Sequence, residues 1–133
     1  MRKELASSFD KVYLTIEFDE ANNWIYSNWI GLIATENVIE GCEAIIDFLH
    51  EHPCPSILND NQLLNGSWSS ANDWIAQHWV PQARAIGLKR VAHIVSPGIF
   101  GQASAAEMAT RLGSQLEMRL FQDVEMAKAW LRL

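Results

Sequence analysis

Hydrophobic and polar residues alternate from residue 12 to residue 18, which places Leu14, Ile16 and Phe18 on one side of the chain. This period of two predicts a half-buried β-strand. A turn rich in Asp and Asn follows, and the run "WIYSNWIG" returns as a second strand from residue 24. We therefore expect the two strands to form an antiparallel hairpin.

The pattern then changes to that of an amphipathic helix between residues 35 and 52. Thr35 is the expected N-cap, and Pro53 ends the helix. Gly41 lies inside it and costs about 1 kcal/mol relative to Ala. The apolar stripe consists of Val38, Ile39, Cys42, Ile45, Ile46 and Leu49.

A short apolar run over residues 56–60 predicts a buried strand, and the polar stretch after it predicts a loop that enters a second helix. Ser70 is the expected N-cap of that helix, with Asp73 at the capping-box position. Pro81 has no backbone N–H to donate, so we expect a kink or a restart there. Gly87 ends the helix.

The rest of the chain predicts a strand, a glycine-containing loop, a helix, a strand and a final helix that Asp123 caps. The order is then β-β-α-β-α-β-α-β-α, which predicts an α/β fold with right-handed crossovers. We expect one domain over residues 1–133, with about five mostly parallel strands, an antiparallel N-terminal hairpin strand and about four helices. Residues 1–10 show no such pattern and are expected to be a disordered N-terminal segment.

Composition narrows the possible functions. Sixteen acidic residues against ten Lys and Arg give a net charge of −6, and the basic residues are scattered, which argues against nucleic-acid binding. No apolar run reaches the length of a membrane span, and the first residues lack the apolar region of a signal peptide. Two cysteines, Cys42 and Cys54, make a poor disulfide framework, so we expect a cytoplasmic protein.

Several segments, taken in order, resemble a known family. They are "WIG" at residues 29–31, the Asp60 loop leading to "DW" at 73–74, the run at 79–97 and "FGQAS" at 100–104. From about residue 12 onward the chain resembles the SpoIIAA-like family of small bacterial proteins. These share the STAS fold of the anti-sigma-factor antagonists and are compared with lipid-binding Sec14 domains. The resemblance implies the fold more than the function, since most members have no assigned activity.

One departure from that family concerns phosphorylation. The antagonists carry a phosphorylatable serine in an Asp-Ser-Ser/Thr-Gly motif, where this chain has "NGSWSSAND". Ser67, Ser69 and Ser70 lie nearby and are the candidates for phosphorylation, and a phosphate at a helix N-terminus would be stabilised there. Capping by Ser70 is the favoured interpretation.

Ligands of parallel α/β sheets bind beyond the carboxyl ends of the strands. Asp60 is the best single candidate for a ligand-binding or catalytic residue at that edge. The favoured interpretation is that it caps the strand or accepts hydrogen bonds from loop amides, since no partner acid or base is visible. "GSWSS" lacks the second glycine of a nucleophile elbow, and the loop "SPGIFGQ" lacks a P-loop lysine. His50, His52 and Cys54 are better explained by the helix C-terminus than by a metal, and His93 by the core.

Six tryptophans in one small domain exceed what a single core easily fills, so some are expected at a contact surface. We therefore expect a non-catalytic STAS-like regulatory or protein-interaction module, whose protein partner is a second copy (a homodimer). The alternative is a carrier or sensor of a small apolar or lipid-like ligand, with Trp29, Trp74, Trp79 and Phe100 around a cavity. An enzyme centred on Asp60 is a third class, and no cofactor or metal is expected. The surface candidates are Trp29, Asp60, Trp74, Trp79, Phe100 and Gln102.

Overall fold

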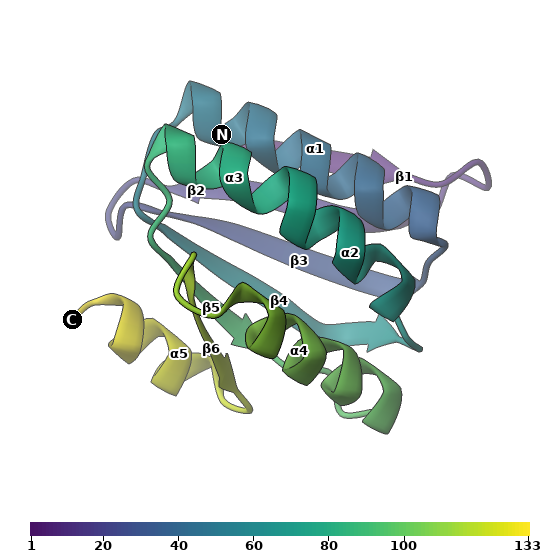
Figure 1. Ribbon diagram of the computed structural model, residues 1–133. Coiled ribbons are helices and arrows are strands. Elements are labelled where there is room, and N and C mark those ends of the chain that lie inside the picture. The colour runs from purple at the N-terminus through teal and green to yellow at the C-terminus, as the bar shows by residue number, and fades with distance from the viewer.

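A computed structural model describes residues 1–133, and its strands form one mixed sheet in which neighbours in sequence are neighbours in space (Figure 1). The first three strands pair antiparallel and the last four pair parallel. The α/β class, the N-terminal hairpin and the mostly parallel remainder are therefore confirmed. The strands are β1 Arg2–Ala6, β2 Val12–Asp19, β3 Trp24–Leu32, β4 Ser56–Asn65, β5 Arg90–Ile94 and β6 Glu117–Phe121.

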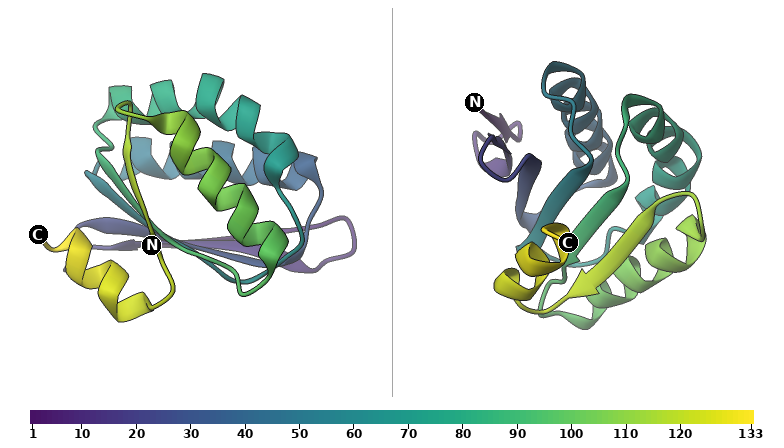
Figure 2. Two further views of the ribbon diagram at one scale, coloured as in Figure 1. Left: turned by 60° about the horizontal axis from the view of Figure 1, so that its bottom comes forward. Right: turned by 90° about the vertical axis from the view of Figure 1, so that its left-hand side faces the viewer.

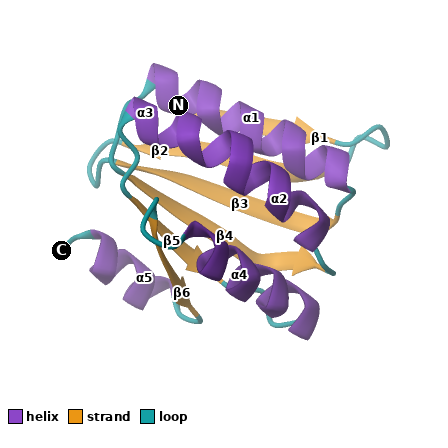
Figure 3. Cartoon of the chain, viewed as in Figure 1, coloured by secondary structure: helices purple, strands orange, loops and turns teal.

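The helices divide between the two faces of the sheet. Right-handed crossovers between adjacent parallel strands place every connecting helix on the same side. Three helical segments accordingly cover one face, and the C-terminal helix covers the other (Figure 2). The alternation of strand and helix along the chain is visible in Figure 3. The helices are α1 Thr35–Glu51, α2 Asn72–Trp74, α3 Val80–Ile86, α4 Ile99–Leu112 and α5 Val124–Leu131.

Each face of the sheet has its own core. The larger core, of 26 buried residues, lies beneath α1, α3 and α4, whereas α5 covers a core of six that includes Trp24, Leu58 and Trp130. At Gly41 in α1, an added Cβ would collide with the side chains of Trp29 and Leu14. The helix-propensity cost of this glycine is thus offset by the close approach of α1 to the sheet.

Two strands differ from the sequence-based expectation. Arg2–Ala6 was expected to be disordered, but it forms β1, an edge strand that pairs with β2 and contributes only a half-buried Leu5 to the core. The strand predicted at 56–60 continues to Asn65, because a register shift opposite Asn28 and Ile30 lets β4 stay paired with β3. The predicted loop after Asp60 is therefore partly strand.

The helix starts also differ in detail. The N-cap of α1 is Ala34, one residue before the expected Thr35, and its N–H donates to Asn37 Oδ1 at 3.1 Å. Ser70 caps no helix, because a 3₁₀ turn, η1 (Ser69–Ala71), precedes α2. The Ser70 hydroxyl instead lies 2.7 Å from Thr35 Oγ1.

Pro81 neither breaks the second helix nor restarts it. A π-helical turn, η2 (Ile75–Trp79), joins α2 to α3 without interruption. Pro81 follows directly after this π-turn, where the helical hydrogen-bond pattern is already irregular. π-turns of this kind are frequent at functional sites, and this one faces the larger core.

Candidate functional site

A cavity of about 90 Å³ lies within the larger core, between the sheet and the helices. Sixteen of its nineteen lining residues are hydrophobic. The sheet contributes Trp29, Ile57 and Val91, among others, and the helical layer contributes Cys42, Trp79 and Met108. The π-turn η2 supplies both Ile75 and Trp79, so the irregular part of the helix forms one wall of the cavity.

The three polar lining residues, Asn59, Asn61 and His93, all come from the sheet. Asn59 and Asn61 are two positions apart on β4 and therefore face the same side. His93 is the direct neighbour of Asn59 on β5. The cavity nevertheless presents an apolar surface, because the polar atoms of these three side chains bond to one another.

The hydrogen bonds of Asn59 determine the tautomer of His93. Asn59 Oδ1 accepts from Ser27 Oγ at 2.6 Å and from Trp29 Nε1 at 2.9 Å. Its amide nitrogen must then be the group 3.0 Å from His93 Nδ1. Because an amide NH₂ only donates, Nδ1 accepts and the proton of the neutral ring is on Nε2.

Burial keeps His93 uncharged. The side chain is 2 % exposed, and desolvation lowers the pKa of His93 to about 4. No carboxylate is among its hydrogen-bond partners, which are the amides of Asn59 and Asn61. His93 is therefore a neutral N–H donor at pH 7, and the prediction of a core histidine is confirmed.

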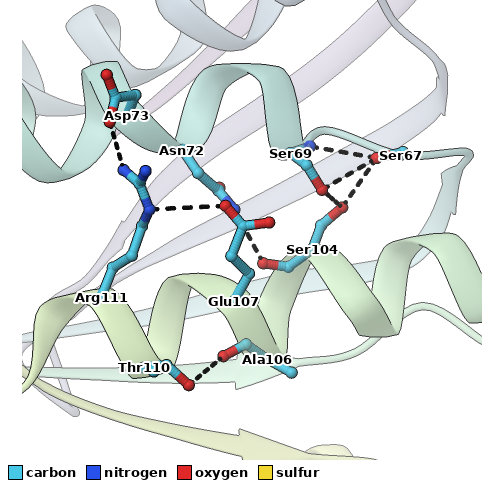
Figure 4. A network of polar contacts seen from close by, with 9 residues as sticks. All are labelled: Ser67, Ser69, Asn72, Asp73, Ser104, Ala106, Glu107, Thr110 and Arg111. Atoms are coloured by element: carbon cyan, nitrogen blue, oxygen red, sulfur yellow. Dashed lines mark hydrogen bonds and ion pairs between the residues drawn. The ribbon is translucent and has the colours of Figure 1, made fainter.

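Trp68 is held over the cavity by a cluster of hydroxyl groups. The fully buried Ser104 of α4 accepts from the Trp68 backbone N–H at 3.1 Å and donates to Phe100 O at 2.9 Å. Ser69 Oγ and Ser67 Oγ lie 2.9 and 3.2 Å from Ser104 Oγ (Figure 4). These serines join the loop after β4 to α4.

Further contacts extend the link between the second helical segment and α4. Asn72 Nδ2 donates to Ser104 O at 3.2 Å, and Arg111 forms an ion pair with Asp73 at 2.7 Å (Figure 4). Asp73 therefore pairs with α4 rather than acting in a capping box. Four of the polar residues of 67–73 thus hold the loop and the helix start against α4, and the fifth, Ser70, contacts α1 through Thr35.

The indole N–H of Trp68 has no acceptor. Four buried side-chain polar atoms lack a hydrogen-bond partner in the protein: Asn28 Oδ1, His52 Nε2, Trp68 Nε1 and Asn72 Oδ1. Of these residues, Trp68 alone lines the cavity. Its ring lies 5.7 Å from that of His93 between centroids, and its nitrogen is buried in the protein rather than exposed to the cavity.

The expected ring of aromatic residues is only partly present. Trp29 and Trp79 line the cavity, and Trp79 Nε1 donates to Cys42 O at 2.8 Å. Trp74 and Phe100 do not line it. Trp74 is half-buried beside His78, and Phe100 is 65 % exposed at the start of α4.

Asp60 faces the opposite side of the sheet from the cavity. It is buried, and its carboxylate accepts from Tyr26 OH at 2.8 Å and from the backbone N–H of Gln62 at 3.0 Å. Burial and this carboxylate raise the pKa of Tyr26. The two residues border an open groove of about 690 Å³ that also includes Arg2 and Lys128.

The remaining candidates lie apart from the cavity. Gln102 donates to Ser96 O at 3.2 Å and so supports the turn into α4. His52 stacks on Phe18, His50 is exposed, and Cys54 is buried near Ser56 O. Burial raises the pKa of the other cysteine, Cys42, to about 12, so it is a neutral thiol in the cavity wall.

The comparisons with known proteins identify no relative. No family model matches the chain, and no curated protein matches it. None of the helices has both the length and the apolar character needed to cross a membrane. The apolar cavity is therefore the basis for a functional proposal.

Proposed function

We propose that this protein is a non-catalytic module that binds a small, mainly apolar molecule in the cavity, as a carrier or a sensor. The observation that carries this proposal is an apolar void lined by residues of the larger core. Protein interiors have few voids larger than a water molecule. A carrier role also fits the resemblance to STAS and Sec14 domains, which we retain as part of the proposal.

The dimensions of the cavity suit a small ligand. An engineered cavity of about 150 Å³ lined by Leu, Ile and Phe side chains binds benzene or xenon. At about 90 Å³ this cavity suits a molecule of a few carbon atoms, or a larger one if the helices move. Its sixteen hydrophobic lining residues favour the apolar part of the ligand.

The arrangement of polar groups favours binding over catalysis. His93 is neutral and bonded to amides, without a carboxylate to orient it or a nucleophile beside it. Asp60 lies on the other face of the sheet and is bonded to Tyr26. A nucleophile or an acid–base pair within hydrogen-bonding reach is needed for the common catalytic arrangements, and the cavity brings none together.

An interaction module is the second candidate, and its partner is a second copy of this chain. Large apolar side chains are exposed on β3, on β4 and at the start of α4: Leu32, Leu63, Ile99 and Phe100. Gly66 lies between β3 and α4. A Cβ added to Gly66 would touch the Leu32 side chain, and a Cβ added to Gly101 would touch the Gly66 carbonyl oxygen. Exposed apolar clusters of this kind mark association surfaces.

Titration with methylenecyclopentane, followed by NMR of the methyl groups, tests the binding proposal. We expect saturable shifts at Ile57, Val91 and Met108, which line the cavity, and none at Leu131, a residue of α5 that packs against the smaller core. Absence of saturable shifts with methylenecyclopentane and also with xenon, a smaller probe, would refute ligand binding in the cavity. Native mass spectrometry of the freshly purified protein separates the two candidate functions. A retained small molecule supports the carrier. A ligand-free dimer that the substitution Phe100→Ser dissociates supports the interaction module.

A further inference from the structure

The strand β6 is the last of the sheet, so one of its sides has no strand beside it (Figure 1). Its other side pairs with β5 along the whole strand. The backbone N–H of Glu117 donates to Lys89 O, and that of Val95 donates to Phe121 O. Backbone groups point to alternate sides from one residue of a strand to the next, so the N–H and C=O of Met118 point away from β5. Unpaired backbone groups of this kind are a template for another strand.

The two open edges of the sheet differ in their side chains. At the β1 edge four of the five residues are exposed, and Arg2 forms ion pairs with Glu4 and Glu17. Charged side chains on an edge strand discourage pairing with another chain. Three of the five residues of β6 are instead half-buried and apolar: Met118, Leu120 and Phe121. The β6 edge is therefore the less protected of the two.

The two charged residues of β6 differ in their partners. Glu117 forms an ion pair with Arg90 at 2.9 Å. Arg119 is exposed and forms no ion pair within the chain. Its guanidinium carbon lies 5.2 Å from the centroid of the Trp130 ring, which holds the group on the α5 side of the sheet. Glu117 lies two positions before Arg119 and faces the same side.

We propose that two copies of this chain associate edge to edge through β6, antiparallel, with Met118 opposite the partner's Met118. In this register the outward N–H and C=O groups of the two Met118 residues bond to each other. Glu117 of each copy then lies opposite the partner's Arg119. Side chains directly opposite each other are about 5 Å apart at Cβ, which is within the reach of an ion pair.

Charge complementarity selects both the partner and the register. The strand carries an acid and a base two positions apart, so a single antiparallel register pairs them twice. A register centred on Arg119 would oppose two arginines, and like charges directly opposite each other are destabilising. The interface uses the same residues of both copies, as a closed twofold dimer requires. It lies on a surface other than the apolar cluster around Phe100 and does not depend on a ligand in the cavity.

Exchange of the two charges tests this interface. Sedimentation equilibrium of the wild-type protein should show a monomer–dimer equilibrium. Arg119→Glu opposes two acids and Glu117→Arg opposes two arginines, so each substitution alone should raise the dimer Kd at least about tenfold. An equal mixture of the two variants restores an acid opposite an arginine at both positions and should form a heterodimer. Phe100→Ser is the control and should leave the dimer intact.

A second measurement uses the wild-type protein alone. Hydrogen exchange at the Met118 backbone amide should slow as the protein concentration is raised, whereas the Arg119 amide, which points toward β5, should change little. A wild-type protein that stays monomeric, a mixture of variants that does not associate, or a Met118 amide whose exchange ignores concentration would overturn the proposal. So would a dimer that Phe100→Ser dissociates and the charge variants do not. Neither charged residue lines the cavity, so none of these results bears on ligand binding.

Discussion

Substitution of Val91 by Ile should stabilise the free protein, which is unusual for an enlargement in a core. Val91 is a buried residue of β5 that lines the cavity. At about 24 cal/mol per Å³, a void of about 90 Å³ costs about 2 kcal/mol of folding free energy. One methylene group placed in it recovers about 0.8 kcal/mol, which raises Tm by roughly 3 °C.

The control substitution is Ala92→Val, at the next position of the same strand. Ala92 is fully buried on the opposite face, in the core beneath α5, and does not line the cavity. Enlargement at a closely packed site costs roughly 1–3 kcal/mol. The two variants thus differ in the sign of the expected change, although both enlarge a buried side chain of β5.

Urea unfolding with linear extrapolation measures both changes, provided that the m-values match that of the wild-type protein. The same Val91→Ile variant should bind methylenecyclopentane about tenfold more weakly, because the ligand must share the cavity with the added carbon. If Val91→Ile destabilises the protein as much as Ala92→Val does, the cavity is not open to a methylene group and the reasoning fails.

Three further predictions concern the polar groups. His93 alone should lower the free energy of unfolding by about 3 kcal/mol between pH 7 and pH 4. The pKa of the buried ring is about 4 in the folded protein and 6.5 in the unfolded chain. As the pH falls through this range, the unfolded chain binds a proton that the folded ring does not bind, so stability is lost. Urea unfolding of His93→Gln across this pH range should show a loss of stability smaller by that amount. If the variant loses as much stability as the wild-type protein, His93 is not a buried neutral ring. Ser104→Ala should lower the free energy of unfolding by roughly 1–3 kcal/mol and speed hydrogen exchange at the Trp68 backbone amide. Its control is Thr110→Ala, which removes an exposed hydroxyl of the same helix and should cost less than about 0.5 kcal/mol. Equal effects of the two substitutions would mean that the serine cluster does not hold the loop. Tyr26→Phe should lower the free energy of unfolding by about 2 kcal/mol, because it removes a hydrogen-bond donor from buried Asp60. The affinity for methylenecyclopentane should stay unchanged. A large loss of affinity would place the binding site on the Asp60 face of the sheet rather than in the cavity.

The elements that the sequence predicted are those whose burial follows a simple period. The alternation of Leu14, Ile16 and Phe18 indicated β2, and these side chains face the helical layer. The strand β1 was missed because an edge strand needs only backbone pairing on one side, and "RKELA" has one apolar residue to bury apart from Ala. Such a strand leaves no periodic signal.

The cavity could not be predicted, because it depends on how far the helices stand from the sheet rather than on any local pattern. The sequence places Asn59 near the end of the predicted strand 56–60 and Asn61 in the loop after it, so their common face was missed. Their spacing of two, next to an apolar run, was the signal that both face one side of a strand. The unbonded indole of Trp68 is a property of the packed structure, and nothing in "NGSWSS" indicates it.

A crystal of the protein under xenon pressure tests the central claim most directly, because xenon enters apolar cavities and is seen without any assumption about the natural ligand. We expect a xenon site between Val91 on the sheet and Trp79 on the helical layer, with reduced occupancy in Val91→Ile crystals. A core in which these side chains meet and xenon finds no site would contradict it.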